Sequence, residues 1–147
     1  RYFNKYGEYD SIGAYQSKES PYYTWFRFMD WPDVYESWWG MTTLPQIEEH
    51  SEECRKYLLS DKDAIVKRWI KNGASGWRLD VVDELPGFFV KELRENVKKA
   101  DKDAVIIGEV WEDASNKSAY GERREYFLGK ELDSVMNYPM RSGKRKN

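Results

Sequence analysis

Segments with helical periodicity alternate with short apolar runs between residues 51 and 138. Ser51 can cap a helix, and apolar residues then recur at helical spacing as far as Asn72-Gly73, a pair typical of a helix end. The sequence does not decide whether Ser60-Asp61 divides this segment into two helices. Further helices are predicted over 89–100 and 120–128, and strands over 76–85, 104–110 and 132–138. Helices and strands in strict alternation predict an α/β fold with parallel crossovers.

Two of the predicted elements carry more detailed expectations. The helix over 89–100 has one apolar stripe, and the run over 104–110 is continuously apolar, which is typical of a strand covered on both faces. Trp69 lies at helical spacing on the first helical segment and is predicted to belong to the core. Cys54 lies on an apolar helical face and is expected to act as a small buried hydrophobe.

The predicted strand 76–85, GWRLDVVDEL, carries charged residues inside an apolar run. Side chains alternate along a strand, so Arg78 and Asp80 share one face with Gly76. The opposite face then carries Trp77, Leu79 and Val81. If the apolar face lies under helices, the charged face lines a barrel interior or a cleft near the carboxyl end of the strand, where active sites of such folds lie. A guanidinium keeps its neighbouring carboxylate ionised, as a nucleophile requires, but a structural ion pair fits the pattern equally well.

Glu109 ends the next predicted strand, and its distance from Asp80 along the chain fits one βαβ unit of about 30 residues. Its neighbours Ile107, Val110 and Trp111 are expected to desolvate it, which raises its pKa and favours the protonated form. One ionised and one protonated carboxyl group about 5 to 5.5 Å apart is the arrangement of a retaining glycosidase. Asp80 would then attack the anomeric carbon, and Glu109 would act as acid and afterwards as base.

Aromatic residues are concentrated in residues 1–40, which hold 14 of the 24 in the chain. This region has no sustained period and is interrupted by Gly and Pro, so we expect a long excursion that packs on itself. Flat rings with polar edges suit stacking on sugars, but a core without aliphatic residues needs the same side chains, and packing is the favoured interpretation. Of Trp38 and Trp39, one is expected to be a sugar platform and the other to pack inward; the sequence does not say which.

Composition excludes several classes of protein. A net charge of −2 with both signs mixed argues against a nucleic-acid partner, and the absence of an apolar run of about 18 residues argues against a membrane span. Single residues of cysteine and histidine exclude an internal disulfide, a cysteine zinc site and a multi-histidine metal site. His50 is expected to be an exposed polar residue. The basic segment 141–147 is expected to be a frayed tail.

The first residue is Arg1 rather than Met, and no signal peptide is evident at the start of the chain. We therefore expect an internal piece of a soluble protein. Its compartment, bacterial cytoplasmic or secreted, stays open.

Three ordered motifs resemble the α-amylase family, glycoside hydrolase family 13, and especially its neopullulanase, cyclomaltodextrinase and amylopullulanase members. GWRLDVVDEL resembles the second signature region of the family, and IIGEVWED resembles the third. LPQIEE, at 44–49, resembles the motif that closes the long loop after barrel strand 3, and residues 2–40 resemble that loop. LDSVMNYP resembles barrel strand 6.

The resemblance implies an α/β fold that is part of a (β/α)8 TIM barrel. Residues 1–43 would form the aromatic loop after strand 3, residues 44–140 the central barrel with strands 4 to 6, and residues 141–147 the basic tail. The first and fourth signature regions are absent, so the third catalytic carboxylate would lie outside this chain. Such a chain is expected to be inactive alone, because its strands have bare edges, and either to self-associate or to require the rest of the barrel.

The resemblance also implies roles for individual residues. Asp80 matches the catalytic nucleophile, Glu109 the general acid/base and Arg78 the invariant arginine. The implied substrate contacts are Trp111, Asp83, Glu84 and Tyr138, although Asp83 and Glu84 fit a solvated strand end equally well.

The expected substrates are α-glucans such as starch, maltooligosaccharides, cyclodextrin or pullulan. No cofactor and no metal ligand is assigned in this chain. Because Gln46 and Glu48 depart from the family pattern, a calcium site in the parent protein is left open. A catalytically silent amylase-like subunit and a noncatalytic carbohydrate-binding module are the alternatives. Retention of the two acids and the arginine argues against the first, and the βαβ pattern argues against the second.

Overall fold

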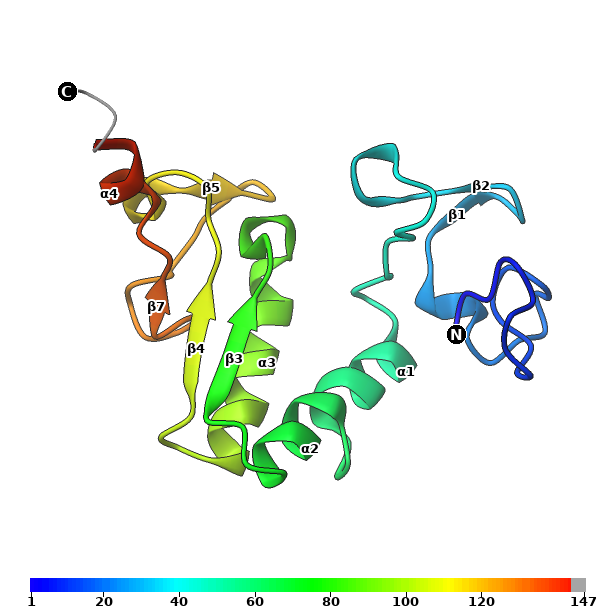
Figure 1. Ribbon diagram of the computed structural model, residues 1–147, viewed down its shortest axis with the longest axis horizontal. Helices are drawn as coiled ribbons and strands as arrows, with labels where there is room; N and C mark the ends of the chain where they lie inside the picture. The colour runs from blue at the N-terminus through cyan, green and yellow to red at the C-terminus, as the bar shows by residue number, and fades with distance from the viewer. Residues whose placement is uncertain (144–147) are drawn as a thin grey trace. The chain divides into compact units, whose positions relative to one another are not determined.

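The computed structural model describes residues 1–143 (Figure 1). The chain divides into two compact units, Arg1–Lys56 and Tyr57–Asn147. Of the predicted basic tail, residues 141–143 belong to helix α4 (Tyr138–Gly143), and residues 144–147 lie outside the described residues. Within the described part of the chain, each helix is too short or too polar to cross a bilayer.

The first unit has little regular structure and is held together by aromatic side chains. Its elements are η1 (Tyr23–Trp25), β1 (Phe28–Asp30), β2 (Val34–Tyr35), η2 (Trp38–Gly40) and α1 (Glu52–Arg55). Phe3, Ala14 and Tyr35 form the buried centre, and the rings of Phe3 and Tyr35 meet edge to face with centroids 4.7 Å apart. The prediction of an aromatic region that packs on itself is confirmed.

A single arginine clamps the end of the first unit. The Arg27 guanidinium contacts three carboxylates, those of Glu36 at 2.6 Å, Glu48 at 3.0 Å and Glu49 at 2.5 Å. Glu36 follows β2, whereas Glu48 and Glu49 precede α1, so the clamp ties together the two ends of the segment between them. The exposed His50 matches its prediction.

The segment after Ser51 consists of two helices separated by a turn. Ser51 caps α1, as predicted, since its hydroxyl accepts a hydrogen bond from the Cys54 amide at 3.5 Å. A π-helical turn, η3 (Lys56–Ser60), follows, and α2 (Ile65–Lys71) begins after a turn that includes Asp61. The break at Ser60-Asp61 is thereby settled. Cys54 is buried as predicted.

Trp69 is not a core residue. The prediction was wrong because Val66 and Ile70 form the buried face of α2, whereas the Trp69 side chain is 54% exposed. Helix α3 (Gly87–Ala100) has the predicted buried stripe, made by Phe89, Val90, Leu93 and Val97. Its last residue, Ala100, was also assigned to the stripe but is exposed. Helices α2 and α3 pack against each other in the second unit.

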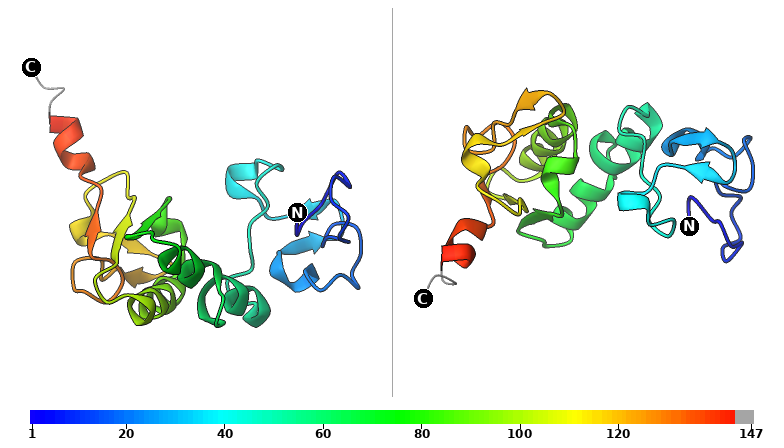
Figure 2. Two further views of the ribbon diagram at one scale, coloured as in Figure 1. Left: turned by 60° about the horizontal axis from the view of Figure 1, so that its bottom comes forward. Right: turned by 90° about the horizontal axis from the view of Figure 1, so that it is seen from above.

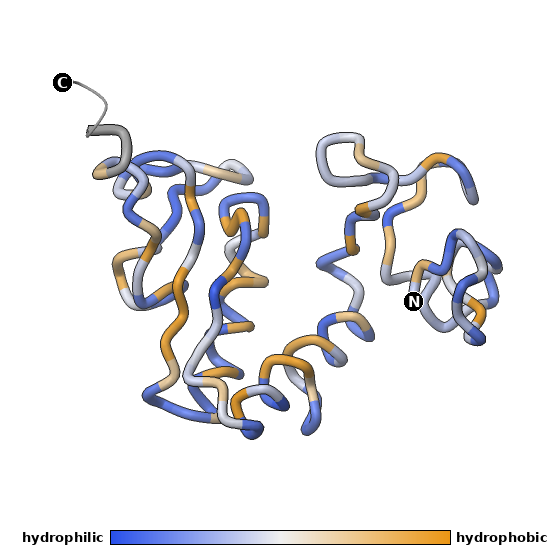
Figure 3. Tube along the Cα trace, in the orientation of Figure 1, coloured by the Kyte–Doolittle hydropathy of each residue, from blue (hydrophilic) through white to orange (hydrophobic). Residues whose placement is uncertain are grey.

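The second unit is built on three parallel strands in the order β3-β4-β7 (Figure 2). Their bounds are Gly76–Leu79, Val105–Gly108 and Ser134–Val135, and α3 lies along one face of the sheet. The α/β fold with parallel strands is confirmed. Figure 3 shows β4 as the most hydrophobic strand of the three. Val105 on β4 is nevertheless 45% exposed, whereas Ile106 on the opposite face is buried. Within residues 1–143, only one face of β4 is therefore fully covered, and the prediction of two covered faces was wrong.

The first strand of this sheet is shorter than predicted. It ends at Leu79, and Val81 has a left-handed backbone with φ 42°, after which the turn η4 (Val82–Glu84) begins. Val81 therefore does not share a strand face with Trp77 and Leu79, contrary to the prediction. The third strand is also shorter, because Tyr138 begins helix α4 instead of ending the strand.

A hairpin replaces the helix predicted over 120–128. After the turn η5 (Ala114–Asn116), strand β5 (Ser118–Ala119) pairs with β6 (Glu122–Arg123) in antiparallel register. The two residues between them, Tyr120 and Gly121, both have positive φ, 54° and 72°. Positive φ at both central residues is the signature of the two-residue turn that matches the twist of a hairpin. The many helix-favouring charged residues in this segment made the prediction wrong.

Asp133 gives the stability of the second unit a defined pH dependence. Partial burial raises its pKa, but the Lys98 ammonium, the Ile106 amide and the Arg94 guanidinium lower it more, to about 2 from 3.8. Because the pKa is depressed in the folded state, this stabilisation is present above the unfolded-state pKa and is lost as the pH falls towards 2. We expect Asp133→Asn to reduce the free energy of unfolding at neutral pH by about 1 to 2 kcal/mol.

Urea denaturation over a pH series measures this effect. The difference between the wild type and Asp133→Asn should narrow as the pH falls from 3.8 to about 2. Asp103→Asn is the control, since Asp103 is an exposed carboxylate whose ion pair is with Lys102. A difference for Asp133→Asn that stays constant across the series would contradict the assignment.

Candidate active site

The parallel register of β3 and β4 brings Asp80 and Glu109 to the same edge of the sheet. Leu79 is aligned with Gly108, so the residues that follow them leave the two strands side by side. The backbone pairing continues past the strand ends, because the Glu109 amide donates to the Leu79 carbonyl at 2.9 Å and the Val82 amide donates to the Glu109 carbonyl at 3.0 Å. The C-terminal ends of β3 and β4 therefore lie side by side, as predicted.

One guanidinium joins the two carboxylates. Nη1 of Arg78 forms an ion pair with the Asp80 carboxylate, and Nη2 lies 2.8 Å from Oε1 of Glu109. Because charge-assisted hydrogen bonds span about 2.7 to 2.9 Å, two carboxylates that share one guanidinium lie within about 8 Å of each other. That range includes the separation of about 5 to 5.5 Å between the two carboxyl groups of retaining glycosidases.

The Glu109 side chain is buried and surrounded by hydrogen-bond donors. The exposed fraction of this side chain is 9%. Oε1 accepts a hydrogen bond from the Tyr138 hydroxyl at 2.9 Å, and Oε2 accepts one from the Val81 amide at 3.2 Å. Burial raises the pKa of Glu109, but the bonds from Tyr138, Val81 and Trp111 and the charge of Arg78 lower it more, so the pKa lies below its ordinary value. The predicted raised pKa was wrong, because the apolar neighbours were considered without these donors.

Val81 owes its contact with Glu109 to its backbone. A positive φ at a β-branched residue is rare, because the branched side chain is crowded in the left-handed region. Here it turns the chain out of β3 and directs the Val81 amide toward Glu109. Strained backbone of this kind occurs preferentially at functional sites.

Asp80 differs from Glu109 in exposure. Its side chain is 76% exposed, so it faces solvent while Arg78 holds one of its oxygens. A shallow pocket of about 270 Å³ lies among the residues that follow β4 and β7. Met136, which lines this pocket, places its sulfur 3.7 Å from Nη2 of Arg78. The charged pair therefore lies next to a hollow at the carboxyl ends of the strands.

The other predicted site residues differ in the hydrogen bonds and ion pairs that they form. Trp111 is half exposed and bonds to Glu109. Asp83 is held by an ion pair with Lys117 at 2.9 Å, and the Glu84 carbonyl accepts a bond from the Tyr120 hydroxyl at 2.7 Å. Sequence reasoning did not identify Lys117, because its position depends on the hairpin that was predicted as a helix.

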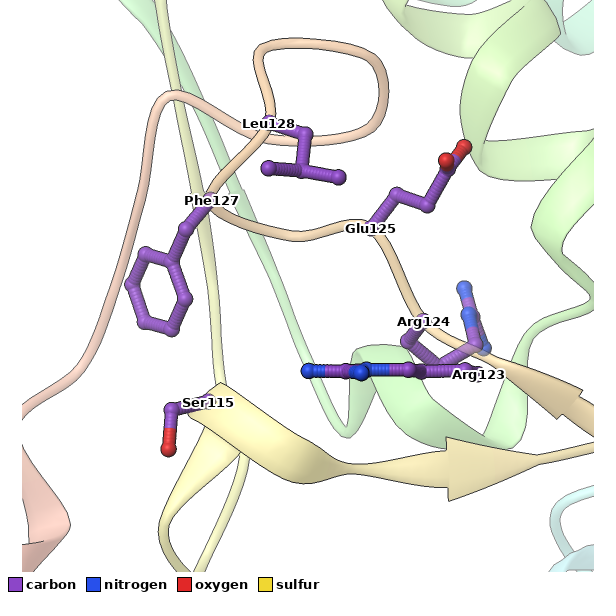
Figure 4. A pocket seen from close by; sticks show the side chains of 6 residues that line it. All are labelled: Ser115, Arg123, Arg124, Glu125, Phe127 and Leu128. Carbon is purple, nitrogen blue, oxygen red and sulfur yellow. The ribbon is translucent and has the colours of Figure 1, made fainter.

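A second pocket shares Phe127 with the first. It measures about 340 Å³ and is bounded by the hairpin and the turn after it (Figure 4). Figure 4 shows the Arg123 guanidinium and the Phe127 ring at this pocket. None of its lining residues belongs to the group around Arg78. Across residues 1–143, no cluster of three or more His, Cys, Asp or Glu side chains is arranged to hold a metal ion.

Comparisons with known proteins agree on one family. Residues 12–147 match the family model described as alpha amylase, catalytic domain. The chain is 35% identical over 96% of its length to an amylopullulanase of Thermoanaerobacterium saccharolyticum, and 38% identical over 85% to a cyclomaltodextrinase of Thermoanaerobacter pseudethanolicus. It spans 12% and 21% of the lengths of these two relatives.

A solved structure gives the same result for the fold. The debranching enzyme of Nostoc punctiforme, in a crystal soaked with acarbose, superposes with a TM-score of 0.68 at 33% identity. The match covers 85% of this chain and 26% of that enzyme.

Proposed function

This chain belongs to the family of α-amylase catalytic domains, and from that premise we propose that it carries part of the active site of a retaining glycoside hydrolase acting on α-glucans. Asp80 is the nucleophile, Glu109 the general acid/base and Arg78 the residue that positions both. The observation that supports the proposal most strongly is the contact of one guanidinium with both carboxylates. The relatives named amylopullulanase and cyclomaltodextrinase support the substrate class.

In the first half-reaction, Asp80 attacks the anomeric carbon of the sugar. Its carboxylate is suited to this role, because it is paired with the Arg78 guanidinium and exposed to an incoming substrate. Glu109 gives a proton to the glycosidic oxygen as the bond from that oxygen to the anomeric carbon breaks. The donors around Glu109 favour its ionised form, so protonation needs a further negative charge near it. The resemblance to the family implies a third carboxylate in the fourth signature region, which lies outside this chain. That carboxylate would supply such a charge.

In the second half-reaction, Glu109 takes a proton from water and the water attacks the anomeric carbon of the glycosyl ester. The bond from that carbon to Asp80 breaks, which releases the Asp80 carboxylate and the sugar. Esterification removes the negative charge of Asp80. Glu109 is then the only charged partner of Arg78 among the two catalytic carboxylates. The arrangement in which Tyr138, Val81 and Arg78 all donate to Glu109 suits this step, because the base must be ionised.

The barrel assignment is part of the same proposal. The strands β3, β4 and β7 correspond to strands 4, 5 and 6 of a (β/α)8 barrel, and the first unit corresponds to the loop after strand 3. Parallel order and polar residues at the carboxyl ends support this correspondence. A parallel sheet also disfavours an all-β carbohydrate-binding module.

The strand edges predict the behaviour of the chain in isolation. Among the described residues, β3 and β7 each pair only with β4 and so present an unpaired edge. We expect the isolated chain to associate through these edges, and to show little or no turnover because the closed barrel is missing. Sedimentation velocity should show an average mass that rises with protein concentration. A well-folded monomer with full turnover would refute this expectation.

Hydrolysis of a maltooligosaccharide by a full-length protein that contains this chain tests the proposed function. Asp80→Ala should abolish it. If hydrolysis survived that change, the nucleophile assignment would fall.

A further inference from the structure

The loop that follows β2 holds a large aromatic residue in a strained backbone conformation. Trp39, inside η2, has φ 49° and ψ 33°, a left-handed conformation that side chains other than glycine rarely adopt. Its side chain is 65% exposed to solvent. Burial does not explain this combination, since most of the indole faces water. Such strain occurs where a side chain has to be presented in a particular direction.

The stem of this loop is fixed at several points. Ser37 and Pro45 form an antiparallel bridge, and the Trp38 amide donates to the Leu44 carbonyl at 3.0 Å. Below the bridge, the Gln46 amide donates to the Glu36 carbonyl at 2.9 Å. The Arg27 clamp holds the same two chain segments through their carboxylates. The tip of the loop therefore stands on a rigid base, as a binding site requires.

The two tryptophans of the loop form a stacked pair. Their ring centroids lie 5.0 Å apart, and the ring planes differ by 18°. Trp38 is the less exposed of the two and supports Trp39 from one side. Met41 and Leu44 are also exposed beside the pair along the chain, with Thr42 and Thr43 between them. The loop therefore presents a stacked indole pair, two further exposed apolar side chains and two hydroxyl groups.

We infer that Trp39 is a platform on which a glucose unit of an α-glucan stacks, with Trp38 as its support. A pyranose has an apolar face of C–H groups and a rim of hydroxyls, which matches an exposed indole with a polar edge. The inference takes its ligand class from the proposed function, but it concerns a site within the first unit and involves neither Asp80 nor Glu109. It also answers which of the two tryptophans faces outward.

Titration of the chain with maltoheptaose, at a protein concentration at which sedimentation shows it to be monomeric, tests the inference. The indole N–H resonance of Trp39 should shift and saturate. Trp39→Gly should weaken binding at least about tenfold, as expected for the loss of a central aromatic contact. Glycine adopts the φ of this position without strain, so the variant removes the ring and leaves the loop intact. Trp69→Ala is the matched control, because Trp69 is also an exposed tryptophan but lies on α2, and it should bind within about twofold of the wild type.

Two results would overturn the inference. One is the absence of a saturable shift at the Trp39 indole, which is decisive even if a variant folds poorly. The other is undiminished affinity in Trp39→Gly. Because no turnover is measured, either result would leave the assignment of Asp80 and Glu109 standing, and the loss of that assignment would not change the titration.

Discussion

Replacing Asp80 with alanine is expected to lower maltoheptaose turnover by a full-length protein that contains this chain by at least about 10⁴-fold. Without the carboxylate no glycosyl ester can form, and the methyl group that remains cannot attack carbon. Arg78 would also lose the partner of Nη1 and keep only Glu109. Initial rates of reducing-sugar release measure the effect, with the amide resonances of the variant as a check that it is folded.

Asp103→Ala is the matched control for Asp80→Ala. Asp103 precedes β4, at the end of the sheet opposite to Glu109, and its ion pair with Lys102 is fully on the surface. The Asp103→Ala variant should turn over maltoheptaose within about twofold of the wild-type rate, as is usual for exposed positions. A similar loss in both variants would show that Asp80→Ala acts through folding instead of chemistry.

Replacing Glu109 with glutamine is expected to have an effect that depends on the leaving group. Turnover of maltoheptaose should fall by about 10³-fold, within the usual range for loss of a general acid. With α-maltosyl fluoride the first step should be nearly unaffected, because fluoride leaves without a proton. The second step then lacks its base, so a glycosyl ester on Asp80 should accumulate. Azide, which needs no base to attack, should restore turnover of the fluoride.

Glu95→Gln is the control for Glu109→Gln. Glu95 lies in the same unit, but its side chain is exposed on α3. It should retain turnover of both substrates. The acid/base role would be contradicted if Glu109→Gln slowed the turnover of α-maltosyl fluoride and of maltoheptaose equally, and if azide did not restore turnover of the fluoride.

The parts of this fold that follow from hydrophobic patterning were predictable. Apolar runs and helical stripes gave β3, β4 and α3, and the spacing of Asp80 and Glu109 placed both at one edge of the sheet. The hairpin was not predictable from periodicity. Its strands have two residues each, too few for a period to appear, and its turn depends on positive φ at Tyr120 and Gly121.

The electrostatics of the site were only half predictable. Arg78 and Asp80 lie two positions apart, so alternation along the predicted strand suggested that they pair, although β3 itself ends at Leu79. The donors on Glu109 could not be read in this way. Tyr138 comes from a distant part of the sequence, and the Val81 amide reaches Glu109 only because the backbone leaves the strand after Leu79. The direction of the pKa shift depends on these tertiary contacts.

The central claim is that Asp80 forms the covalent bond to the sugar, and that Glu109 first donates and then accepts the proton. The most direct measurement is peptide mass analysis of the Glu109→Gln variant quenched during its reaction with α-maltosyl fluoride. We expect one maltosyl group on the peptide that contains Asp80, and none after azide is added. A maltosyl group on another carboxylate, or an unmodified protein that still turns over the fluoride, would contradict the account.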